Sequence, residues 1–311
     1  FGKGDSIIFN MELCPRKRLD FKKILWSVRK SKLLMSASLD LEKKDKFNLN
    51  LFTEKILLED SGMFLESKEK AVSGTVKANL QINSCLHDFS KTSVKGDIKA
   101  ENLSFFIDRL SSGIKDSSIL LKFSGDKIQI SSIALNTENS SLKINGNLKG
   151  WNGIKGNINI DSDFFDFSDI TGSENFAKDE RNASKPNPLI NNSDISININ
   201  LKKGRWKKAE YSQLNAETAY RAGTFFIDRC KVLAEKGVLK IKGYFKTGAD
   251  KETSLAGYIK LDKYPAQNIL LSVLKEKNLK IEGVDLSTEG FFSIKGRDKK
   301  ELIENMNGGA N

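Results

Sequence analysis

Histidine is almost absent from this 311-residue chain, which contains only His87. A single histidine leaves little room for catalytic triads, histidine-ligated metals or histidine-based proton transfer. Cysteine is nearly as scarce, because Cys14, Cys85 and Cys230 lie far apart and form no CxxC motif. Such an odd, sparse set gives neither a disulfide framework nor a zinc site, although one bridge stays open. We therefore expect no enzyme, no metal site and no cofactor.

Long apolar runs are missing as well. No stretch approaches the ~18 apolar residues of a membrane-spanning helix. The chain begins with Phe1 and shows no signal peptide, so we interpret it as an internal piece of a longer protein. The formal charge of +11 is spread along the chain. It favours anionic surfaces in general without choosing among them, and no nucleic-acid-binding motif is present, so we expect no nucleic acid partner.

What the sequence does contain is alternation of apolar and polar residues. Val76–Ile82 and Ile195–Leu201 alternate strictly, as strands with one apolar and one polar face do. Asn152-Gly153, between two such segments, is a strong hairpin signal. Weaker turn signals occur at Gly125-Asp126, Asn145-Gly146 and Gly248–Asp250. The sequence therefore predicts a mostly β fold, with an elongated, twisted antiparallel sheet of repeated β units and few helices.

Four segments have helical patterns, the first of them basic and amphipathic: Phe21–Leu34, Leu103–Ile114, Pro265–Lys275 and Arg297–Met306. Between Gly172 and Ser193 the chain is polar, contains two prolines and alternates little, which predicts a flexible linker or long loop. We divide the chain accordingly into an N-terminal β segment with a basic helix (1–70), a first β repeat (71–171), the linker (172–193) and a second β repeat (194–311).

The evidence for a repeat is a matched order of motifs on the two sides of the linker. The first copy runs from Phe123 to Asp161 and the second from Ala222 to Asp262. Each copy has a turn glycine, then Leu-Lys-Ile-x-Gly, then Gly-x-Ile-x-Ile/Leu-Asp or a close variant of it. The two glycines are 21 residues apart in one copy and 20 in the other. This order favours an array of stacked β units over a plain meander.

The same stretches resemble the AsmA family of bacterial envelope proteins, which includes TamB- and YhdP-like members. The resemblance covers roughly residues 70–311 and is carried by Gly125–Gly146, Gly223–Gly243, Asn157–Asp169, Asp194–Gly204 and Phe292–Gly308. It implies a sheet curled into a groove that conducts phospholipid acyl chains between the inner and outer membranes. It also implies a periplasmic location, a parent protein anchored in the inner membrane of a Gram-negative bacterium, and a role in outer membrane biogenesis and envelope integrity.

The residue pattern agrees with this resemblance on one physical point. One-sided strands leave a large apolar sheet face that must be covered by a second sheet, by closure of the sheet on itself or by a bound apolar ligand. By their phase in the alternation, we assign as groove-lining residues Val76, Ala78, Leu80, Ile82, Ile158, Ile160, Ile197, Ile199, Leu201, Leu239, Ile241, Ile259 and Leu261. The rival interpretation is a structural or assembly-factor β protein of the envelope, with a sealed core and protein partners.

Three segments contain residue types that carry chemistry elsewhere. Cys85–Asp88 combines a thiol, an imidazole and a carboxylate, but neighbouring residues on a turn seldom converge, so we predict a loop. Asp161–Asp169 is acidic and aromatic but lacks the glycine and glutamate of a calcium loop, so we predict a strand edge whose phenylalanines pack inward. The basic residues from Arg16 to Lys32, around Trp26, suggest a headgroup contact or the solvated face of a helix.

Overall fold

The computed structural model shows a mostly β protein, as the sequence predicts. It describes residues 6–14, 17–40, 42, 46–61, 72–106, 113–171, 192–206, 209–234, 237–248, 252–265, 285–297, 301 and 304–310. Hydrogen bonding assigns 17 strands to one sheet and three short strands to another. The chain forms two compact units: unit 1 (Phe1–Asp108, Ser112–Glu138, Ile144–Asn152) and unit 2 (Arg109–Ser111, Asn139–Lys143, Gly153–Asn311).

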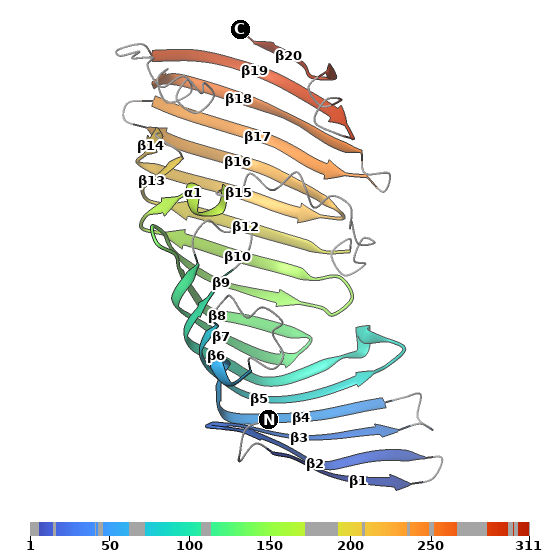
Figure 1. The fold of residues 1–311 in the computed structure, drawn as a ribbon. Helices are drawn as coiled ribbons and strands as arrows, with labels where there is room; N and C mark the ends of the chain where they lie inside the picture. The colour runs from blue at the N-terminus through green and yellow to red at the C-terminus, as the bar shows by residue number, and fades with distance from the viewer. Residues whose placement is uncertain are drawn as a thin grey trace. The chain divides into compact units, whose positions relative to one another are not determined.

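In unit 1, eight strands follow one another and each pairs antiparallel with the next. They are β1 (Ser6–Cys14), β2 (Arg18–Val28), β3 (Ser31–Asp40), β4 (Lys46–Leu57), β5 (Ser73–Cys85), β6 (Ser93–Phe105), β7 (Ile114–Gly125) and β8 (Lys127–Asn136). Two 3-10 turns, η1 (Leu58–Ser61) and η2 (Phe89–Lys91), flank β5. These strands lie side by side in a single layer (Figure 1). Strand β9 (Ser141–Lys149) has residues in both units.

Unit 2 contains a second run of paired strands, in the order β10, β12, β15, β16, β17, β18, β19 and β20. Their bounds are Lys155–Ser162, Asp194–Leu201, Gln213–Arg221, Thr224–Ala234, Gly237–Thr247, Thr253–Pro265, Asp285–Gly296 and Asn307–Ala310. The remaining elements are β11 (Phe165–Asp166), α1 (Ser168–Thr171), β13 (Gly204–Trp206) and β14 (Ala209–Tyr211). In this run all neighbours are antiparallel except β10 and β12, which run parallel, and β11 and β13 of the three-stranded sheet are parallel as well. The large sheet is therefore mixed, with mostly antiparallel pairs as the sequence predicts.

Both copies of the repeat have the same elements in the same order. In the first copy β7 and β8 form a hairpin, and β9 and β10 follow. In the second copy β15 and β16 form a hairpin, and β17 and β18 follow. The turn glycines Gly125 and Gly223 both have positive φ, 70° and 81°, which glycine adopts without strain. The turn predicted at Asn145-Gly146 is wrong, because both residues lie inside β9.

The basic helix predicted at Phe21–Leu34 is also wrong, because the segment forms β2 and β3. A β-bulge explains the helical appearance of its sequence. The register of β2 against β3 shifts between Phe21 and Ile24, where β2 carries one residue more than its partner. The bulge gives Phe21, Ile24, Leu25 and Val28 the i, i+3, i+4, i+7 spacing of an amphipathic helix.

The turn between β2 and β3 carries no glycine or asparagine to mark it. It consists of Arg29 and Lys30, with Arg29 at φ 49°. Tertiary contacts hold this turn. Arg29 lies 3.7 Å from the carboxylate of Asp60, which also accepts a 2.7 Å hydrogen bond from Ser31. The sequence therefore contains no local signal for the hairpin.

The other predicted helices have mixed outcomes. Leu103 belongs to β6 and Ile114 to β7, so the ends of that segment are strands. Pro265 ends β18, and residues 266–275 lie outside the described residues. Near the C-terminus, the backbone N–H of Asn305 donates to the carbonyl of Glu301 (2.9 Å), the i→i−4 bond of a helical turn. The predicted linker lies outside the described residues up to 191.

Candidate functional site

The predicted lining residues of unit 2 all lie on one face of its sheet. Residues paired across neighbouring strands point to the same side, and the pairing connects the predicted residues in rows. The first row contains Ile160, Ile199, Ala216, Cys230, Ile241 and Ile259. The second row contains Ile158, Ile197, Thr218, Ile227, Gly243, Gly257 and Phe292. The third row contains Ser162, Leu201, Leu214, Val232, Leu239 and Leu261. We call these three rows the apolar face of unit 2.

The predicted residues of β5 share a face of the unit 1 sheet in the same way. Val76, Ala78, Leu80 and Ile82 alternate along the strand. Their partners are Ile56, Thr53, Leu51 and Leu49 on β4, and Ala100, Ile98, Gly96 and Val94 on β6. The structure thus assembles the predicted residues into an apolar face within each unit.

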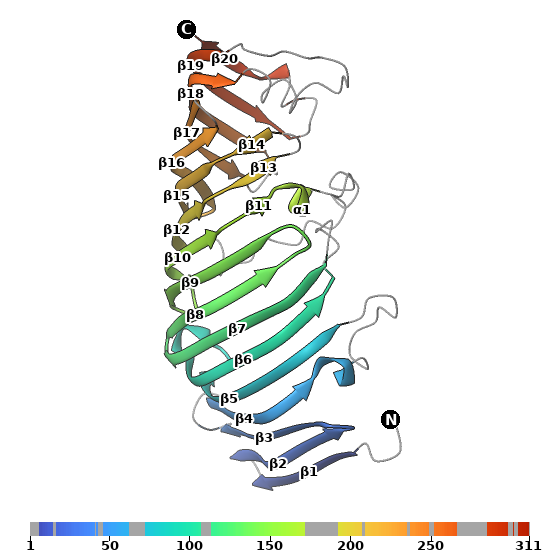
Figure 2. The same cartoon turned by 90° about the vertical axis from the view of Figure 1, so that its left-hand side faces the viewer.

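Both faces are only partly covered. Of the predicted lining residues, only Ala78 (8% exposed) and Leu201 (3%) are buried, and the others are half-buried. Inward-facing residues of a two-sheet sandwich would be covered by the second sheet. Among the described residues, no second layer of comparable size faces either sheet (Figures 1 and 2).

A small sheet covers one end of the apolar face of unit 2. Its strands β11, β13 and β14, which we call the cap sheet, continue from the ends of β10, β12 and β15 after a short bend (Figure 2). The parallel hydrogen-bond ladder passes through this bend: Lys202 N–H donates to the Ser162 carbonyl (2.9 Å), and Phe165 N–H donates to the Lys203 carbonyl (2.9 Å). The cap sheet is therefore the folded-over end of the main sheet.

Aromatic side chains attach the cap sheet to the third row. Phe165 (5% exposed) and Tyr211 (7%) form a core with Leu201 and Val232, against which Phe167 packs. The Tyr211 hydroxyl donates to the Phe165 carbonyl (3.0 Å), and burial raises the pKa of this tyrosine above its usual range. At this end the face is sealed. This contact was not predicted from the sequence, since Phe165 and Tyr211 are 46 residues apart.

The acidic-aromatic segment Asp161–Asp169 is part of this cap, and its outcome agrees with the predicted strand edge. Phe165 is buried and Phe167 is half-buried, although Phe164 stays 40% exposed. Asp169 is 1% exposed and accepts hydrogen bonds from Ser140 (2.6 Å) and Asn139 (3.0 Å). Its oxygens therefore face protein donors. Within the described part of the chain, no three His, Cys, Asp or Glu side chains converge to hold a metal ion.

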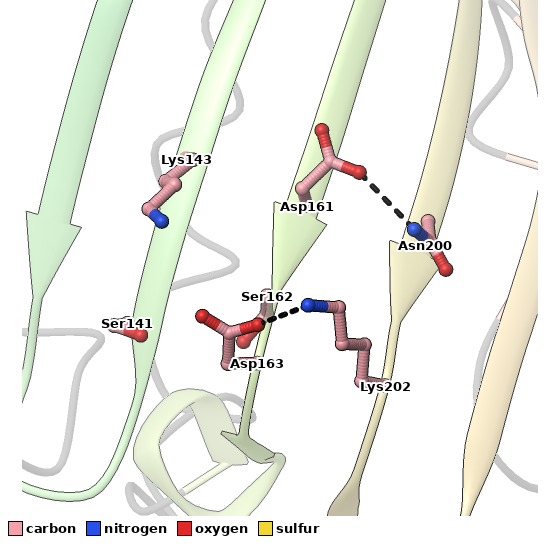
Figure 3. Close-up of a pocket in the computed structure, with 7 residues that line it drawn as sticks. All are labelled: Ser141, Lys143, Asp161, Ser162, Asp163, Asn200 and Lys202. Atoms are coloured by element: carbon pink, nitrogen blue, oxygen red, sulfur yellow. Dashed lines mark hydrogen bonds and ion pairs between the residues drawn. The ribbon is translucent and has the colours of Figure 1, made fainter.

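A polar pocket of about 270 Å³ lies beside Asp161 and Asn200 (Figure 3). These two residues alternate with row residues along β10 and β12, so their side chains point away from the apolar rows. The pocket is lined by Ser141, Lys143, Asp161, Ser162, Asp163, Asn200 and Lys202. Lys202 pairs with Asp163 (2.7 Å), and Asn200 donates to Asp161 (3.3 Å). The hydrogen bond from Lys202, helped by the charge of Lys143, lowers the pKa of Asp163. Lys202 and Asp163 thus balance each other's charge in this pocket.

Cys85–Asp88 forms the turn after β5, as predicted. The Asp88 carboxylate accepts a hydrogen bond from the backbone N–H of Ser90 (3.1 Å) and forms an ion pair with Lys91 (3.0 Å). Asp88 thereby caps η2. The hydrogen bond from Ser90 lowers the pKa of Asp88, and Lys91 adds to this effect. Asp88 is thus a capping residue of the short helix. No disulfide joins Cys85 to Cys230, and the Cys14 side chain lies outside the described residues.

Of the described basic residues around Trp26, Lys22 and Lys23 lie on β2 and Lys32 on β3, and Arg29 and Lys30 form the turn between these strands. Trp26 is 8% exposed, and its β2 neighbours Lys22 and Lys23 are exposed. Lys22 pairs with Glu12 of β1. The predicted helix face is wrong, because Lys22 and Lys23 lie on a strand, and the headgroup contact stays a prediction.

Comparison of the chain with protein-family models, curated proteins and solved structures found no match in any of the three. Within the described residues, no helix has the length and apolar character needed to cross a membrane.

Proposed function

We propose that this chain is a non-enzymatic segment of an AsmA-like protein and holds phospholipid acyl chains on its apolar sheet faces. The carrying observation is the apolar face of unit 2. Its rows cross six strands and consist mostly of Ile, Leu and Val, with Thr218, Gly243 and Gly257 interrupting the second row. The Ile, Leu and Val side chains outside the cap sheet stay half-buried. A surface of this kind is a binding site for an apolar partner.

The dimensions of the rows suit an acyl chain. Six neighbouring strands, from β10 to β18, span roughly 24 Å at about 4.8 Å per strand. One acyl chain covers about half of the ~30 Å hydrocarbon core of a bilayer, or ~15 Å. A single row is therefore long enough for one chain. Covering each half-exposed Ile or Leu would contribute on the order of 1 kcal/mol.

The opposite face explains how such a sheet stays in water. Between the row residues of β12 lie Ser196, Asn198 and Asn200, all exposed. Asn198 donates to Asn159 of β10 (3.1 Å), so the polar side chains also bond to each other across strands. Lipid headgroups would remain in water near such residues at the rim, while the acyl chains lie on the rows.

The test is a pair of matched double variants on one strand. Ile197→Asp/Ile199→Asp places two charges on the apolar face, and Ser196→Asp/Asn198→Asp places the same charges on the polar face of β12. Lipid that co-purifies with each folded protein is extracted and quantified by mass spectrometry, with circular dichroism as the check on folding. We expect the first variant to lose bound phospholipid and the second to keep the wild-type amount.

Equal lipid content in both folded variants, or no lipid in the wild-type protein, would contradict the proposal. Should the double Asp variant fail to fold, Ile259→Asn tests the same rows with a single uncharged change. A protein free of lipid that captures an envelope protein through its apolar face would instead favour the structural or assembly role.

The proposal also includes the location of the protein and the membranes between which it acts. Transfer between inner and outer membranes, a periplasmic location and anchoring of the parent protein in the inner membrane rest on the family resemblance. The apolar faces support the lipid-binding part of it. No nucleic acid partner and no cofactor are part of this proposal.

A further inference from the structure

The polar face of unit 2 carries a cluster of aromatic rings across β16 to β19. Phe226 pairs with Tyr244, and Tyr258 pairs with Phe291. The ring centroids are 6.4 Å apart in the first pair and 5.0 Å in the second. All four rings lie on the side opposite to the apolar rows, because they alternate with Ile227, Gly243, Gly257 and Phe292.

Two of these rings are open to solvent. Phe291 is 70% exposed and Tyr244 is 40% exposed. The β20 residue opposite Phe291 is Gly309, which has no side chain to cover the ring. Phe291 contacts Tyr258, but at 70% exposure most of its ring surface remains available to a partner.

Lysines surround the rings. Lys240, Lys242 and Lys246 alternate with Tyr244 along β17, and Lys231 pairs with Lys240 from β16. All four are exposed, and none forms an ion pair with a described residue. Lys260 differs from them, since it is bound to Glu289 (2.8 Å). These four positive charges, which have no ion-pair partner among the described residues, favour an anionic partner.

We propose that this basic-aromatic face docks on the surface of an anionic phospholipid bilayer. Tyrosine and phenylalanine partition into the headgroup region, and lysines beside them are attracted to anionic lipids. The lysine stems reach outward from the sheet, so the ammonium groups meet headgroup phosphates while the rings enter between them.

The ring geometry favours a membrane over single-stranded nucleic acid. Base stacking needs open ring faces in succession along the strand. Here the rings pack against each other in pairs inclined by 48°, which covers part of each face. Insertion into a headgroup layer requires only an exposed ring edge. Arg221, whose guanidinium lies 5.7 Å from the Phe226 centroid, is itself paired with Asp194 (3.6 Å).

This inference goes beyond the proposed function and does not depend on it, because the docking face and the apolar rows are opposite sides of the sheet. Lipid content of the purified protein reports on the rows, whereas binding to intact vesicles reports on the lysines and rings. A negative result in one assay therefore does not contradict the proposal that the other assay tests.

The experiment measures co-sedimentation of the whole chain with vesicles of phosphatidylcholine and phosphatidylglycerol, and with vesicles of phosphatidylcholine alone. Lys240→Gln/Lys242→Gln removes two charges from the face. Lys95→Gln/Lys122→Gln removes two exposed lysines from β6 and β7 of unit 1, which carries none of the four rings, and is the matched control. Phe291→Ser removes one aromatic ring from the face. Because the Phe291 side chain is exposed, we expect this variant to fold.

We expect the wild-type chain to bind the anionic vesicles and to release them as salt rises. Lys240→Gln/Lys242→Gln should weaken binding about 30-fold, from the attraction expected of two lysines near an anionic surface. Phe291→Ser should weaken it several-fold, and the control should stay near wild type. If both lysine double variants weaken binding equally, the net charge of the chain alone explains the effect, and the proposal is overturned. Equal binding to neutral vesicles, or tighter binding of single-stranded DNA with the same dependence on Lys240 and Lys242, would overturn it as well.

Discussion

Arg205 pairs through its Nε with the carboxylate of Asp166, a side chain with no exposed surface. The two residues are 39 positions apart and belong to β13 and β11, the parallel pair of the cap sheet. The Asp166 backbone N–H in turn donates a hydrogen bond to the Ser140 hydroxyl oxygen (2.9 Å). This group of contacts fixes the cap sheet over the third row.

Replacing Arg205 should therefore loosen the cap. In Arg205→Ala the buried carboxylate loses its cation, and because Arg205 is 46% exposed, water compensates for part of the loss. We expect a decrease of about 1–3 kcal/mol in the free energy of unfolding, measured by urea denaturation. Arg229→Ala is the control, since Arg229 pairs with Glu217 at 3.6 Å in full exposure to solvent, and a change below about 0.5 kcal/mol is expected there. Similar losses for both variants would show that the Asp166 pair contributes nothing special.

The same carboxylate gives the cap a defined dependence on pH. Burial raises the pKa of Asp166, but hydrogen bonds from Ser168 and Arg205 outweigh this effect, and the pKa lies below its ordinary value. A depressed pKa means that the unfolded state takes up the proton first, so the stabilisation is complete above about pH 4 and is lost as the pH falls further. We expect the free energy of unfolding to decrease below about pH 4 and Asp166→Asn to flatten that decrease. An unchanged slope in the variant would exclude Asp166 as the titrating group.

Gly204 is the tightest position of the cap sheet. A Cβ atom there would lie 2.0 Å from the Phe165 carbonyl oxygen and 2.2 Å from the Tyr211 hydroxyl. Gly204→Ala should therefore displace Tyr211 from Leu201 and cost about 2–3 kcal/mol, as overpacking of a fixed site does. Gly309→Ala offers the comparison, because a Cβ atom at Gly309 meets nothing within 4 Å. Thermal unfolding of the two variants side by side distinguishes them, and equal midpoints would show that the cap has room to adjust.

In unit 1, Ser31 connects two buried groups. Its hydroxyl donates to Asp60 (2.7 Å) and accepts from the backbone N–H of Leu57 (2.8 Å), and its side chain is fully buried. Ser31→Ala leaves both groups short of a partner and should destabilise the protein by about 1–3 kcal/mol. Ser36→Ala removes only the exposed bond from Asn50 (3.2 Å) and should leave urea unfolding nearly unchanged. If Ser31→Ala is equally mild, water replaces the hydroxyl at this site.

The strands and their faces could be predicted from the sequence because period-two alternation is a local property. Ile197 and Ile199 are assigned to the same face by their spacing alone, and the pairing with Ile158 and Ile160 agrees with that assignment. Alternation does not distinguish parallel from antiparallel neighbours, which is why the parallel pairing of β10 with β12 was missed.

Other features depend on long-range contacts that leave no local pattern. The cap sheet requires three strands to bend at the same place, and its aromatic core joins Phe165 to Tyr211 from distant parts of the chain. The hairpin turn at Arg29 is stabilised by Asp60 and contains no glycine, so the local sequence does not reveal it. The segment that begins at Phe21 was predicted as a helix because the bulge adds one residue to the strand and changes the apparent period of its sequence.

The cap sheet makes the two halves of the third row unequal in solvent access. Leu201 (3% exposed) and Val232 (9%) lie beneath it, whereas Leu239 and Leu261 remain half-buried. Under the proposed function, an apolar molecule could lie on Leu239 and Leu261 directly, whereas Tyr211 covers Leu201 and would have to move before the molecule reached it. The usable length of this row would therefore depend on the cap sheet.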